Sequence, residues 1–376
     1  MTGPLIQMTI GKANPNRANG VNAVVHGLAG ALQARGAKVE VWGITPTPAA
    51  PTTARSYPLH LFKRKAHRLG LDAKLVQAID ALPGSAIVHF HSGLLPEYFL
   101  IARELKRRQL PWVLSPHGAY AEGALAKGAL KKRLYIRLFE RFVIRHALRI
   151  HSLALGSAGG LREEISSPQL VVIPNGSEAP REPFAELSVS PFCFCYCGRI
   201  DEQTKGLDLL GRALRLVLRE RPEVRLDMIG DGPDLDRVQA DFEALGLANN
   251  VTWHGARFGD EKRALLLAAS CFVLTSRHEG FPMSLSEAAA MGLPLLVTEG
   301  TNFGAYVREW ECGVVAAETT EQAIATSMLS LVGTPSEELC KMGREARRLI
   351  REELSWDRIA ERMLRQLYGV TPGVSE

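Results

Sequence analysis

The stretch RHEGFPMSLSEAAAMGLPLLVTEG, residues 277–300, holds two glutamates eight positions apart, Glu279 and Glu287. It follows an apolar strand pattern, CFVLTS, and its second half predicts a helix that begins near Met283. In open parallel sheets, ligands bind beyond the carboxyl ends of the strands, where a helix N-terminus favours an anion such as a phosphate. We therefore expect this turn to hold a diphosphate, with both carboxylates accepting hydrogen bonds from hydroxyl-bearing rings. Spacing alone fits a solvated loop carboxylate and a first-turn helix charge equally well.

A second candidate, GRIDEQTKG at residues 198–206, follows the strand pattern FCFCYC. Arg199 and Lys205 stand in one strand-to-helix loop between glycines, so the two cations could converge on one anionic group. Positive charges in loops are common and mostly inert, so the pair alone does not establish a site. Its predicted place at the same sheet edge as residues 277–300 favours a shared anion site.

Length and composition indicate a soluble protein of two domains. The 376 residues exceed one ordinary domain, and the charged (23%) and hydrophobic (46%) fractions are typical of globular chains. The longest uncharged apolar run, residues 264–276, is shorter than the roughly 20 residues that span a bilayer. The N-terminus lacks a signal-peptide pattern. We expect a cytoplasmic protein whose six cysteines are reduced rather than disulfide-bonded.

Strand patterns alternate with helix patterns along the chain, which predicts parallel βαβ units. The expected fold class is α/β, with two Rossmann-like, doubly wound domains that face each other across a cleft. The proline-rich residues 174–191 predict the linker. The expected boundaries are 1–180 and 181–355, followed by a C-terminal helix, 356–376, that packs back on the N-terminal domain.

Charge is distributed unevenly between the two halves. Residues 1–185 contain 24 Lys and Arg against 11 Asp and Glu, a net charge of +13, whereas the remainder contains 21 against 29, a net charge of −8. The first half should therefore prefer an anionic surface or an anionic partner.

The segment 131–149 concentrates this positive charge. Five arginines recur every four residues, so on one α-helix they would spiral over roughly 160° of its surface, with apolar side chains among them: Arg133, Arg137, Arg141, Arg145 and Arg149. The pattern fits a helix on an anionic membrane leaflet and, equally well, a solvated face with some arginines paired internally.

Several motifs together resemble the family-four retaining glycosyltransferases of GT-B fold, also called group 1 glycosyl transferases. The motifs stand in the expected order along nearly the whole chain: GRIDEQTKG, EGFPMSLSE, VVIPNG, IGDGPDLDRV, VTWHG and SWDRIAERMLRQLY. The resemblance implies that the N-terminal domain binds the acceptor and the C-terminal domain binds a nucleotide sugar. It also implies transfer without a metal or another cofactor.

The resemblance assigns roles to residues of the C-terminal domain. Glu287 would bind the ribose hydroxyls, Glu279 would contact the donor sugar, and Arg199 and Lys205 would neutralise the departing diphosphate. The backbone of the turn would cap that diphosphate, through Gly280, Phe281, Pro282, Met283, Ser284 and Leu285. The segment after VTWHG would border the base, through His254, Gly255, Ala256 and Arg257.

In the N-terminal domain, ANGVNAVVHGLAGAL and LSPHGAY carry the similarity. The first places Gly20 and Val21 near the phosphates, and the second gives His117 a place facing the donor sugar. From local sequence alone, His117 is more simply a structural histidine at a strand end. His89 and His91 lie two apart on one strand and, with no third ligand nearby, predict hydrogen-bonding residues rather than a metal site.

IGDGPD after a strand is similar to a dinucleotide-binding loop, but Leu235 replaces its third glycine, so a nicotinamide oxidoreductase is disfavoured. The sequence therefore predicts a retaining hexosyltransferase that uses a UDP-sugar first of all. Its acceptor would be a glycan or a lipid-linked saccharide in cell-surface polysaccharide biosynthesis, and nucleic acid is not expected. Two alternatives remain open, a nucleotide-sugar epimerase of the same fold and a non-catalytic nucleotide-sugar sensor. The expected location is the cytoplasm, with peripheral binding at the inner membrane face depending on residues 131–149.

Overall fold

The computed structural model divides the chain into two compact units. Unit 1 comprises Met1–Gly176 and Trp356–Glu376, and unit 2 comprises Ser177–Ser355. The structure describes residues 3–14, 20–49, 55–67, 70–120, 129–154, 170–179, 183–184, 186–187 and 189–370. The boundary after Gly176 falls inside the proline-rich stretch 174–191, slightly before position 180.

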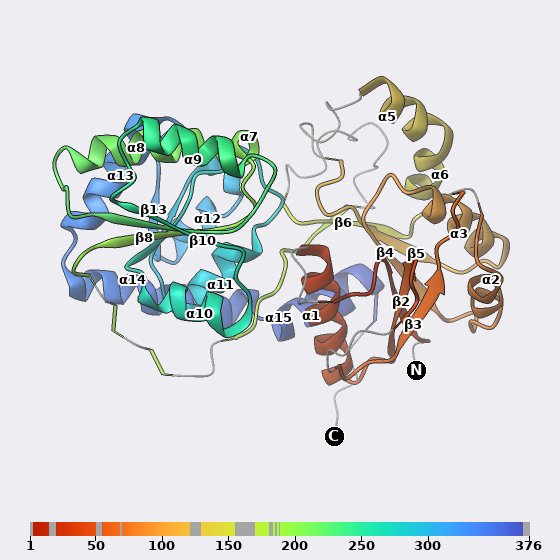
Figure 1. Ribbon diagram of the computed structural model, residues 1–376. Helices are drawn as coiled ribbons and strands as arrows, with labels where there is room; N and C mark the ends of the chain where they lie inside the picture. Colours follow the sequence, from red (N-terminus) through yellow and green to blue (C-terminus); the bar gives the residue numbers. More distant parts are fainter. Residues whose placement is uncertain are drawn as a thin grey trace. The chain divides into compact units, whose positions relative to one another are not determined.

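Unit 1 contains a parallel sheet in the order β3-β2-β1-β4-β5-β6-β7 (Figure 1). Its strands are β1 (Leu5–Ile10), β2 (Val39–Thr45), β3 (Leu59–Lys63), β4 (Ile87–His91), β5 (Trp112–Ser115), β6 (Arg149–Ser152) and β7 (Leu170–Val172). Its helices are α1 (Gly20–Ala34), α2 (Ala73–Asp80), α3 (Pro96–Arg107), α5 (Ala129–Tyr135), α6 (Arg141–Arg145) and α15 (Trp356–Arg362). The central strands are buried on both faces, as helices on both sides of a parallel sheet require, and polar residues such as Gln7, His89 and His91 are buried among their apolar ones.

Unit 2 contains a second parallel sheet, in the order β10-β9-β8-β11-β12-β13. Its strands are β8 (Cys193–Cys197), β9 (Arg225–Ile229), β10 (Val251–Gly255), β11 (Cys271–Leu274), β12 (Leu295–Val297) and β13 (Gly313–Val315). Its helices are α7 (Glu202–Lys205), α8 (Leu207–Leu218), α9 (Leu235–Ala244), α10 (Gly259–Ala268), α11 (Met283–Met291), α12 (Gly304–Glu309), α13 (Glu321–Gly333) and α14 (Ser336–Leu349). The fold is therefore α/β with two doubly wound domains, as predicted.

Both sheets reverse their strand order beside their first strand. In unit 1 the reversal lies between β1 and β4, and in unit 2 between β8 and β11. Two loops diverge at such a point and leave a crevice at the carboxyl ends of the strands. Each unit therefore offers one topological switch point for a ligand.

The edge strand β3 is an element that the sequence patterns do not predict. Its sequence, LHLFK, is short, follows the Pro/Thr-rich break, and only Phe62 of its residues is buried. It forms because its backbone completes the hydrogen bonding of β2. This pairing depends on a neighbouring strand, so the local sequence carries little signal for it.

The C-terminal segment belongs to unit 1. It consists of α15 and a π-helical stretch, Met363–Tyr368. The Trp356 indole lies so close to Gly27 and Gly176 that a Cβ atom at either glycine would overlap it. Arg35 donates to both carboxylate oxygens of Asp357, at 2.7 and 2.8 Å. The segment is thereby fixed against α1 at the protein surface.

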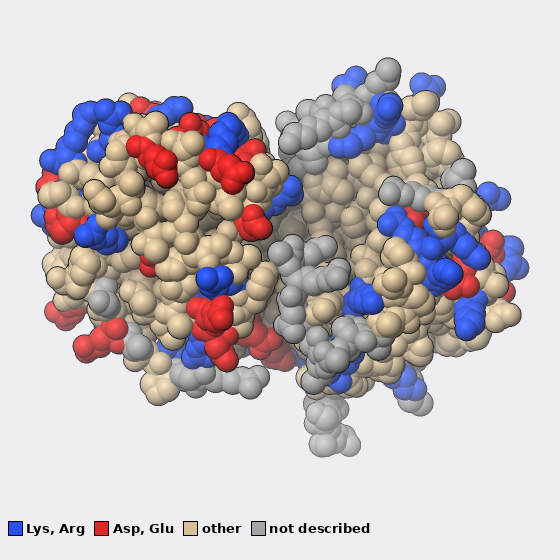
Figure 2. All heavy atoms as spheres, in the orientation of Figure 1, with Lys and Arg blue, Asp and Glu red and all other residues tan. Residues whose placement is uncertain are grey.

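The basic segment 131–149 is not one regular α-helix. A π-helical stretch, Ile136–Glu140, separates α5 from α6 and changes the helical phase. The prediction of five arginines on one helix is wrong for Arg149, which begins β6 after the helix ends at Arg145. Figure 2 shows Lys and Arg side chains over the α5 region of unit 1. Among the described helices, none combines the length and apolar character needed to cross a membrane.

Candidate functional site

Two loops of unit 2 meet at its topological switch point. One runs from β8 to α7 through residues 198–201, and the other runs from β11 to α11 through residues 275–282. Because β8 and β11 are hydrogen-bonded neighbours, their following loops lie at the same edge of the sheet. The two sequence motifs that carry the predicted anion site are therefore brought together by the fold.

An ion pair joins the end of α7 to the second loop, because Lys205 is the last residue of α7 rather than a loop residue as predicted. Lys205 Nζ contacts the Glu279 carboxylate, and the side chains are 16% and 13% exposed. Ser276 Oγ donates to the same carboxylate oxygen at 2.9 Å. The pair places a cation and a carboxylate side by side in a site only partly open to water, where charge interactions are stronger than on the surface.

Helix α11 begins beside this pair without a side-chain cap. Pro282 occupies the N-cap position, and its side chain offers no acceptor to the first backbone N–H groups of the helix, although its carbonyl accepts from Leu285 N at 3.2 Å. Those N–H groups and the positive end of the helix dipole favour an anion. The ion pair and the uncapped helix are thus two separate features of one sheet edge that suit a phosphate group.

Glu287 lies in the second turn of α11 and pairs with Lys262 of α10, with Nζ and Oε2 2.8 Å apart. Burial disfavours the charge on Lys262, but the Glu287 carboxylate outweighs this effect and raises the pKa of Lys262. Sequence reasoning did not find Lys262, because a lysine within GDEKRALLLA looks like an ordinary solvated charge. Its pairing with Glu287 exists only through the packing of α10 against α11.

Arg199 is exposed at the tip of the β8–α7 loop, and no described carboxylate forms an ion pair with it. Its backbone is fixed by the Tyr196 hydroxyl, which donates to the Arg199 carbonyl at 2.8 Å. The guanidinium is therefore available in the loop that leads into α7, whose last residue is Lys205.

The IGDGPD motif, residues 229–234, packs closely against the β8–α7 loop. A Cβ atom at Gly230 would overlap the Gly198 carbonyl oxygen, and one at Gly232 would overlap the Ile200 carbonyl oxygen. Ile200 N donates to the Asp231 carbonyl at 3.0 Å. These glycines permit a close approach between two backbone segments, which explains a glycine-rich loop that lacks the dinucleotide pattern.

The turn that carries Glu279 is also held by hydrogen bonds from Arg277 and Asn302. Arg277 donates to both carboxylate oxygens of Asp208 at 2.8 Å. Burial alone would raise the pKa of Asp208, but the hydrogen bonds from Arg277 outweigh it, so the pKa lies below its ordinary value. Asn302 Nδ2 donates to the Glu279 carbonyl. Sequence reasoning missed Arg277 and Asn302, whose partners are distant in the chain.

The remaining predicted residues of the turn divide into buried and partly exposed groups. Phe281 and Leu285 are buried, and Phe281 packs against Phe303 and Tyr306 with ring centroids 5.1 and 6.0 Å apart. Met283 and Ser284 are partly exposed at the start of α11. The buried side chains of Phe281 and Leu285 anchor the turn in the core of unit 2.

The segment His254–Arg257 comprises the last two residues of β10, the edge strand of the sheet, and the two residues that follow it. His254 Nε2 lies 3.0 Å from Asp227 Oδ1, and Gly255 has a φ of +66°. Ala256 and Arg257 are exposed, and the Arg257 guanidinium bonds its own neighbour, the Ala256 carbonyl, at 3.2 Å.

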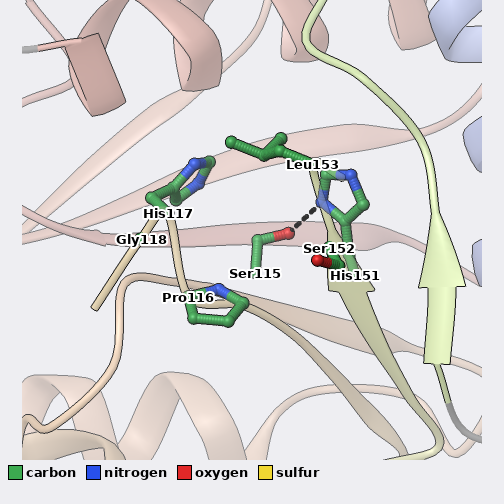
Figure 3. Close-up of a pocket in the computed structure, with 7 residues that line it drawn as sticks. All are labelled: Ser115, Pro116, His117, Gly118, His151, Ser152 and Leu153. Carbon is green, nitrogen blue, oxygen red and sulfur yellow. Dashed lines mark hydrogen bonds between the residues drawn. The ribbon is translucent and has the colours of Figure 1, made fainter. Parts of the chain in front are cut away.

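In unit 1, Gly20 and Val21 begin α1, after β1 at the switch point of the first sheet. His117 follows β5 in the left-handed region, with a φ of +49°. Figure 3 shows His117 and His151 on either side of Ser115 in a small pocket. The volume of this pocket is about 10 Å³, enough for roughly one water molecule. Burial lowers the pKa of His117 to about 3, so its imidazole is neutral.

His89 and His91 are buried hydrogen-bonding residues of β4, as their spacing predicted. His89 bonds Tyr368 and Ser115 at 2.7 and 2.6 Å, and His91 bonds His117 and Gln7 at 2.9 and 2.8 Å. Within the described part of the chain, no group of three His, Cys, Asp or Glu side chains is arranged to hold a metal ion.

Residues 180–349 match the family model of glycosyl transferases group 1, and residues 19–176 match that of the glycosyl transferase 4-like domain. The chain belongs to the group 1 glycosyltransferases. Together the matched residues include every candidate site residue and the unit 2 switch point, whereas β1, on one side of the unit 1 switch point, precedes them.

Two relatives illustrate the range of this family. The chain is 25% identical over 256 residues to a GDP-mannose:cellobiosyl-diphosphopolyprenol alpha-mannosyltransferase of Xanthomonas oryzae, covering 67% of this chain and 66% of that protein. It is 26% identical over 284 residues to a glycogen synthase of Mycobacterium tuberculosis, covering 73% and 66%. The alignments thus span just under two thirds of these relatives.

Solved structures share the fold along the whole chain. HepE of Anabaena, in a complex with UDP-glucose, superimposes with a TM-score of 0.76 and covers 98% of this chain and 100% of its own, at 16% identity. At 16% identity this similarity supports the fold alone, so the chemistry must be argued from the residues of this chain.

Proposed function

We propose that this protein is a retaining glycosyltransferase that transfers a hexose from a nucleoside diphosphate sugar to a glycan or a lipid-linked saccharide. The observation that carries the proposal is the convergence of the Lys205–Glu279 pair and the uncapped N-terminus of α11 at one switch point. Departure of the diphosphate creates negative charge, and preorganised donors aimed at that charge are usually the largest catalytic contribution.

Each residue then has a role in this reaction. Lys205, Arg199 and the backbone N–H groups of α11 stabilise the leaving diphosphate, without a metal or another cofactor. Glu279 accepts hydrogen bonds from the donor sugar, and Glu287 accepts them from the ribose. In a front-face reaction the leaving phosphate itself takes the proton of the acceptor hydroxyl, so no protein nucleophile is required.

The donor is proposed as a UDP-sugar. HepE of Anabaena was crystallised with UDP-glucose, whereas the Xanthomonas relative is named for GDP-mannose, so the base must be tested directly. A thermal-shift panel of UDP, GDP, ADP and their sugars is suitable, because a ligand that binds the folded state raises Tm. A Tm increase with UDP-sugars that exceeds those with GDP and ADP compounds is expected. Unchanged Tm values with every nucleotide would contradict the proposed function.

Turnover separates the three classes of protein that share such a site. A transferase releases the nucleoside diphosphate in proportion to acceptor, an epimerase produces a new nucleotide sugar from the donor alone, and a sensor binds without turnover. Incubation of the bound donor with and without glycan acceptors, followed by chromatography of the sugars, distinguishes them. Acceptor-dependent transfer that persists in EDTA is the expected result.

The acceptor is proposed to be anionic, in cell-surface polysaccharide biosynthesis. The first 185 residues carry a net charge of +13, and the Xanthomonas relative is named for an acceptor with a diphosphopolyprenol. Diphosphate and lipid headgroups are anionic, so both suit this positive half.

Peripheral binding to the inner membrane face is part of the same proposal. Arg133 and Arg137 are exposed beside Leu134 and Leu138, which are 58% and 57% exposed, so cationic and apolar side chains share one surface of α5 and its extension. Each arginine near an anionic leaflet contributes about 1 kcal/mol.

Vesicle pelleting tests the membrane proposal. The double variant Arg133→Gln/Arg137→Gln should bind anionic vesicles roughly 30-fold more weakly. Arg103→Gln/Arg107→Gln removes two exposed arginines with the same spacing from α3 and should bind like the wild type. Binding of the wild type that is indifferent to anionic lipid would refute this part.

A further inference from the structure

An unbroken chain of hydrogen bonds crosses unit 1 from His117 to a backbone carbonyl. It connects side chains of β1, β4, β5 and β6, the loop after β5, and the end of the C-terminal segment. In order, it runs through His117, His91, Gln7, Tyr368, His89, Ser115, His151 and the Ile173 carbonyl, with distances of 2.9, 2.8, 3.1, 2.7, 2.6, 2.6 and 2.6 Å.

The carbonyl end sets the direction of the first bond. A carbonyl oxygen only accepts, so His151 Nε2 must carry a hydrogen and donate it to Ile173. Burial lowers the pKa of His151 to about 4, so the ring is neutral and its Nδ1 has a lone pair. His151 Nδ1 therefore accepts from the Ser115 hydroxyl, whose single hydrogen is thereby used.

The directions of the next three hydrogen bonds, through His89 and Tyr368, follow in the same way. The Ser115 oxygen must accept from His89 Nε2–H. Burial lowers the pKa of His89 well below its ordinary value, so His89 Nδ1 accepts from the Tyr368 hydroxyl. Tyr368 has then used its only hydrogen, and its oxygen accepts from the Gln7 amide nitrogen.

The directions of the last two hydrogen bonds, which lead to His117, follow from the orientation of Gln7. Gln7 has donated through Nε2, so its Oε1 accepts from His91 Nε2–H. Burial lowers the pKa of His91 as well, so its Nδ1 accepts from His117 Nε2–H. Neutral His117 then has a lone pair on Nδ1, and none of the described residues bonds that atom. The direction of every bond is fixed from Ile173 to His117.

We propose that this chain holds His117 as the Nε2-protonated tautomer and presents its Nδ1 as an acceptor to a hydroxyl of the sugar substrate. The proposal rests on the proposed function and on the family resemblance, which gives His117 a place facing the donor sugar. Tyr368, Ser115, Gln7, His89 and His91 act as positioning residues, because they set the tautomer without touching substrate. A group that carries no hydrogen at the same position would lose this bond.

The anchor at Ile173 makes the direction stable. Hydroxyls can rotate and the amide can turn, so the interior bonds could all reverse together. Reversal would place a lone pair of His151 against the buried Ile173 carbonyl and leave that oxygen unsatisfied, which disfavours it by roughly tenfold or more. Tyr368 is the connection between the anchored part and the part that ends at His117.

The tautomer can be measured directly in the full chain by NMR of protein labelled with ¹⁵N-histidine. Couplings of the ring nitrogens to the carbon-bound protons distinguish a protonated from an unprotonated nitrogen, and the loss of one signal set in His117→Gln assigns His117. The expected result for the wild type is a protonated Nε2 and an unprotonated Nδ1. A protonated Nδ1 at neutral pH would overturn the proposal.

Tyr368→Phe tests the connection. It removes one hydroxyl and should shift His117 from one tautomer to a mixture. Tyr57→Phe is the matched control. It removes a buried hydroxyl that bonds His26 at 2.7 Å in the same unit but is not part of the hydrogen-bond chain from His117 to Ile173. An unchanged His117 tautomer in Tyr368→Phe would refute the connection.

Ser115 supplies an independent variant if Tyr368→Phe folds poorly. Ser115→Ala breaks the chain between His89 and His151 and should also give mixed tautomers, whereas Ser115→Thr keeps a hydroxyl and should restore the wild-type tautomer. Equal spectra for Ala and Thr at this position would contradict the proposal.

Kinetics separate this inference from the proposed function. Tyr368→Phe should raise the donor KM by roughly threefold to tenfold with a smaller change in kcat, while Tyr57→Phe leaves both unchanged. A wild type that shows no transfer with any donor would overturn the proposed function, although the NMR result would still decide the tautomer. An active wild type with the same donor KM in Tyr368→Phe would overturn the positioning role alone.

Discussion

The switch points of the two units carry polar groups of opposite kinds. In unit 2 the groups are ionic and partly exposed, as in the Lys205–Glu279 and Lys262–Glu287 pairs. In unit 1 they are neutral, and all but the partly exposed His117 are buried, as in the hydrogen-bond chain from His117 to Ile173. The same topology therefore supports two tasks. Charge suits the stabilisation of a diphosphate, and a directed neutral chain suits the orientation of one hydrogen bond.

The two sites also differ in how they are held. The loops of unit 2 approach each other through glycines at the backbone, and the Arg277–Asp208 pair closes the turn from outside. The site of unit 1 is held by side-chain hydrogen bonds between neighbouring strands. Substitutions in unit 2 should therefore act through charge and backbone spacing, and those in unit 1 through bond direction.

Lys205→Ala should produce the largest effect on turnover. Loss of one charged hydrogen bond of about 1.5 to 3 kcal/mol to the leaving diphosphate predicts roughly a 10- to 150-fold decrease in kcat. Lys341→Ala removes an exposed lysine of the same unit and should leave kcat unchanged. Initial rates at saturating donor measure both. Activity of Lys205→Ala within about twofold of the wild type would show that charge is not what the unit 2 site contributes.

Gly206→Ala tests backbone spacing. Gly206 has a φ of +63°, and a Cβ atom there would overlap the Thr275 carbonyl oxygen. We expect a loss of about 2 to 3 kcal/mol in the free energy of unfolding, together with reduced turnover, because the Lys205 loop must move away from β11.

Gly246→Ala is the matched control. Gly246 has a φ of +80° but no atom near the added Cβ, so only the conformational strain of about 1 kcal/mol should appear, without a change in kcat. Denaturant unfolding and initial rates compare the two variants. Equal losses of stability would mean that the close approach at Gly206 is unimportant.

Glu287→Gln should have a moderate effect on donor binding. The amide keeps one acceptor for a ribose hydroxyl but loses the charge, so we expect the donor KM to increase roughly twofold to tenfold. Glu243→Gln, at an exposed position of α9, serves as the control. A donor KM that remains the same in Glu287→Gln would place the ribose elsewhere.

Arg277→Met should have the smallest effect, and this effect should depend on pH. Arg277 holds the pKa of Asp208 below its ordinary value of 3.8, so their interaction stabilises the fold above that pH and is lost as the pH falls through the lower, folded-state pKa. At pH 7 the variant should lose about 1 kcal/mol of unfolding free energy. The difference from the wild type should shrink in acid, and denaturant curves at pH 7 and pH 3 measure it. A difference that is constant with pH would assign the loss to packing.

The sequence by itself determined the alternation of strands and helices, the α/β class, the motifs after β8 and β11, and the hydrogen-bonding character of His89 and His91. These features depend on residues within one strand–loop–helix unit, so local patterns are sufficient to predict them. Family membership followed from the same motifs in their order along the chain.

Only the tertiary structure decided the partners of these residues. Lys262 beside Glu287, Arg277 on Asp208, and Tyr368 between His89 and Gln7 join positions that are far apart in sequence. The phase change at Ile136–Glu140 and the pairing of β3 likewise depend on neighbouring elements. Hydrogen bonds and ion pairs act over a few ångströms in space, and a single sequence does not contain the folded distance between two distant residues.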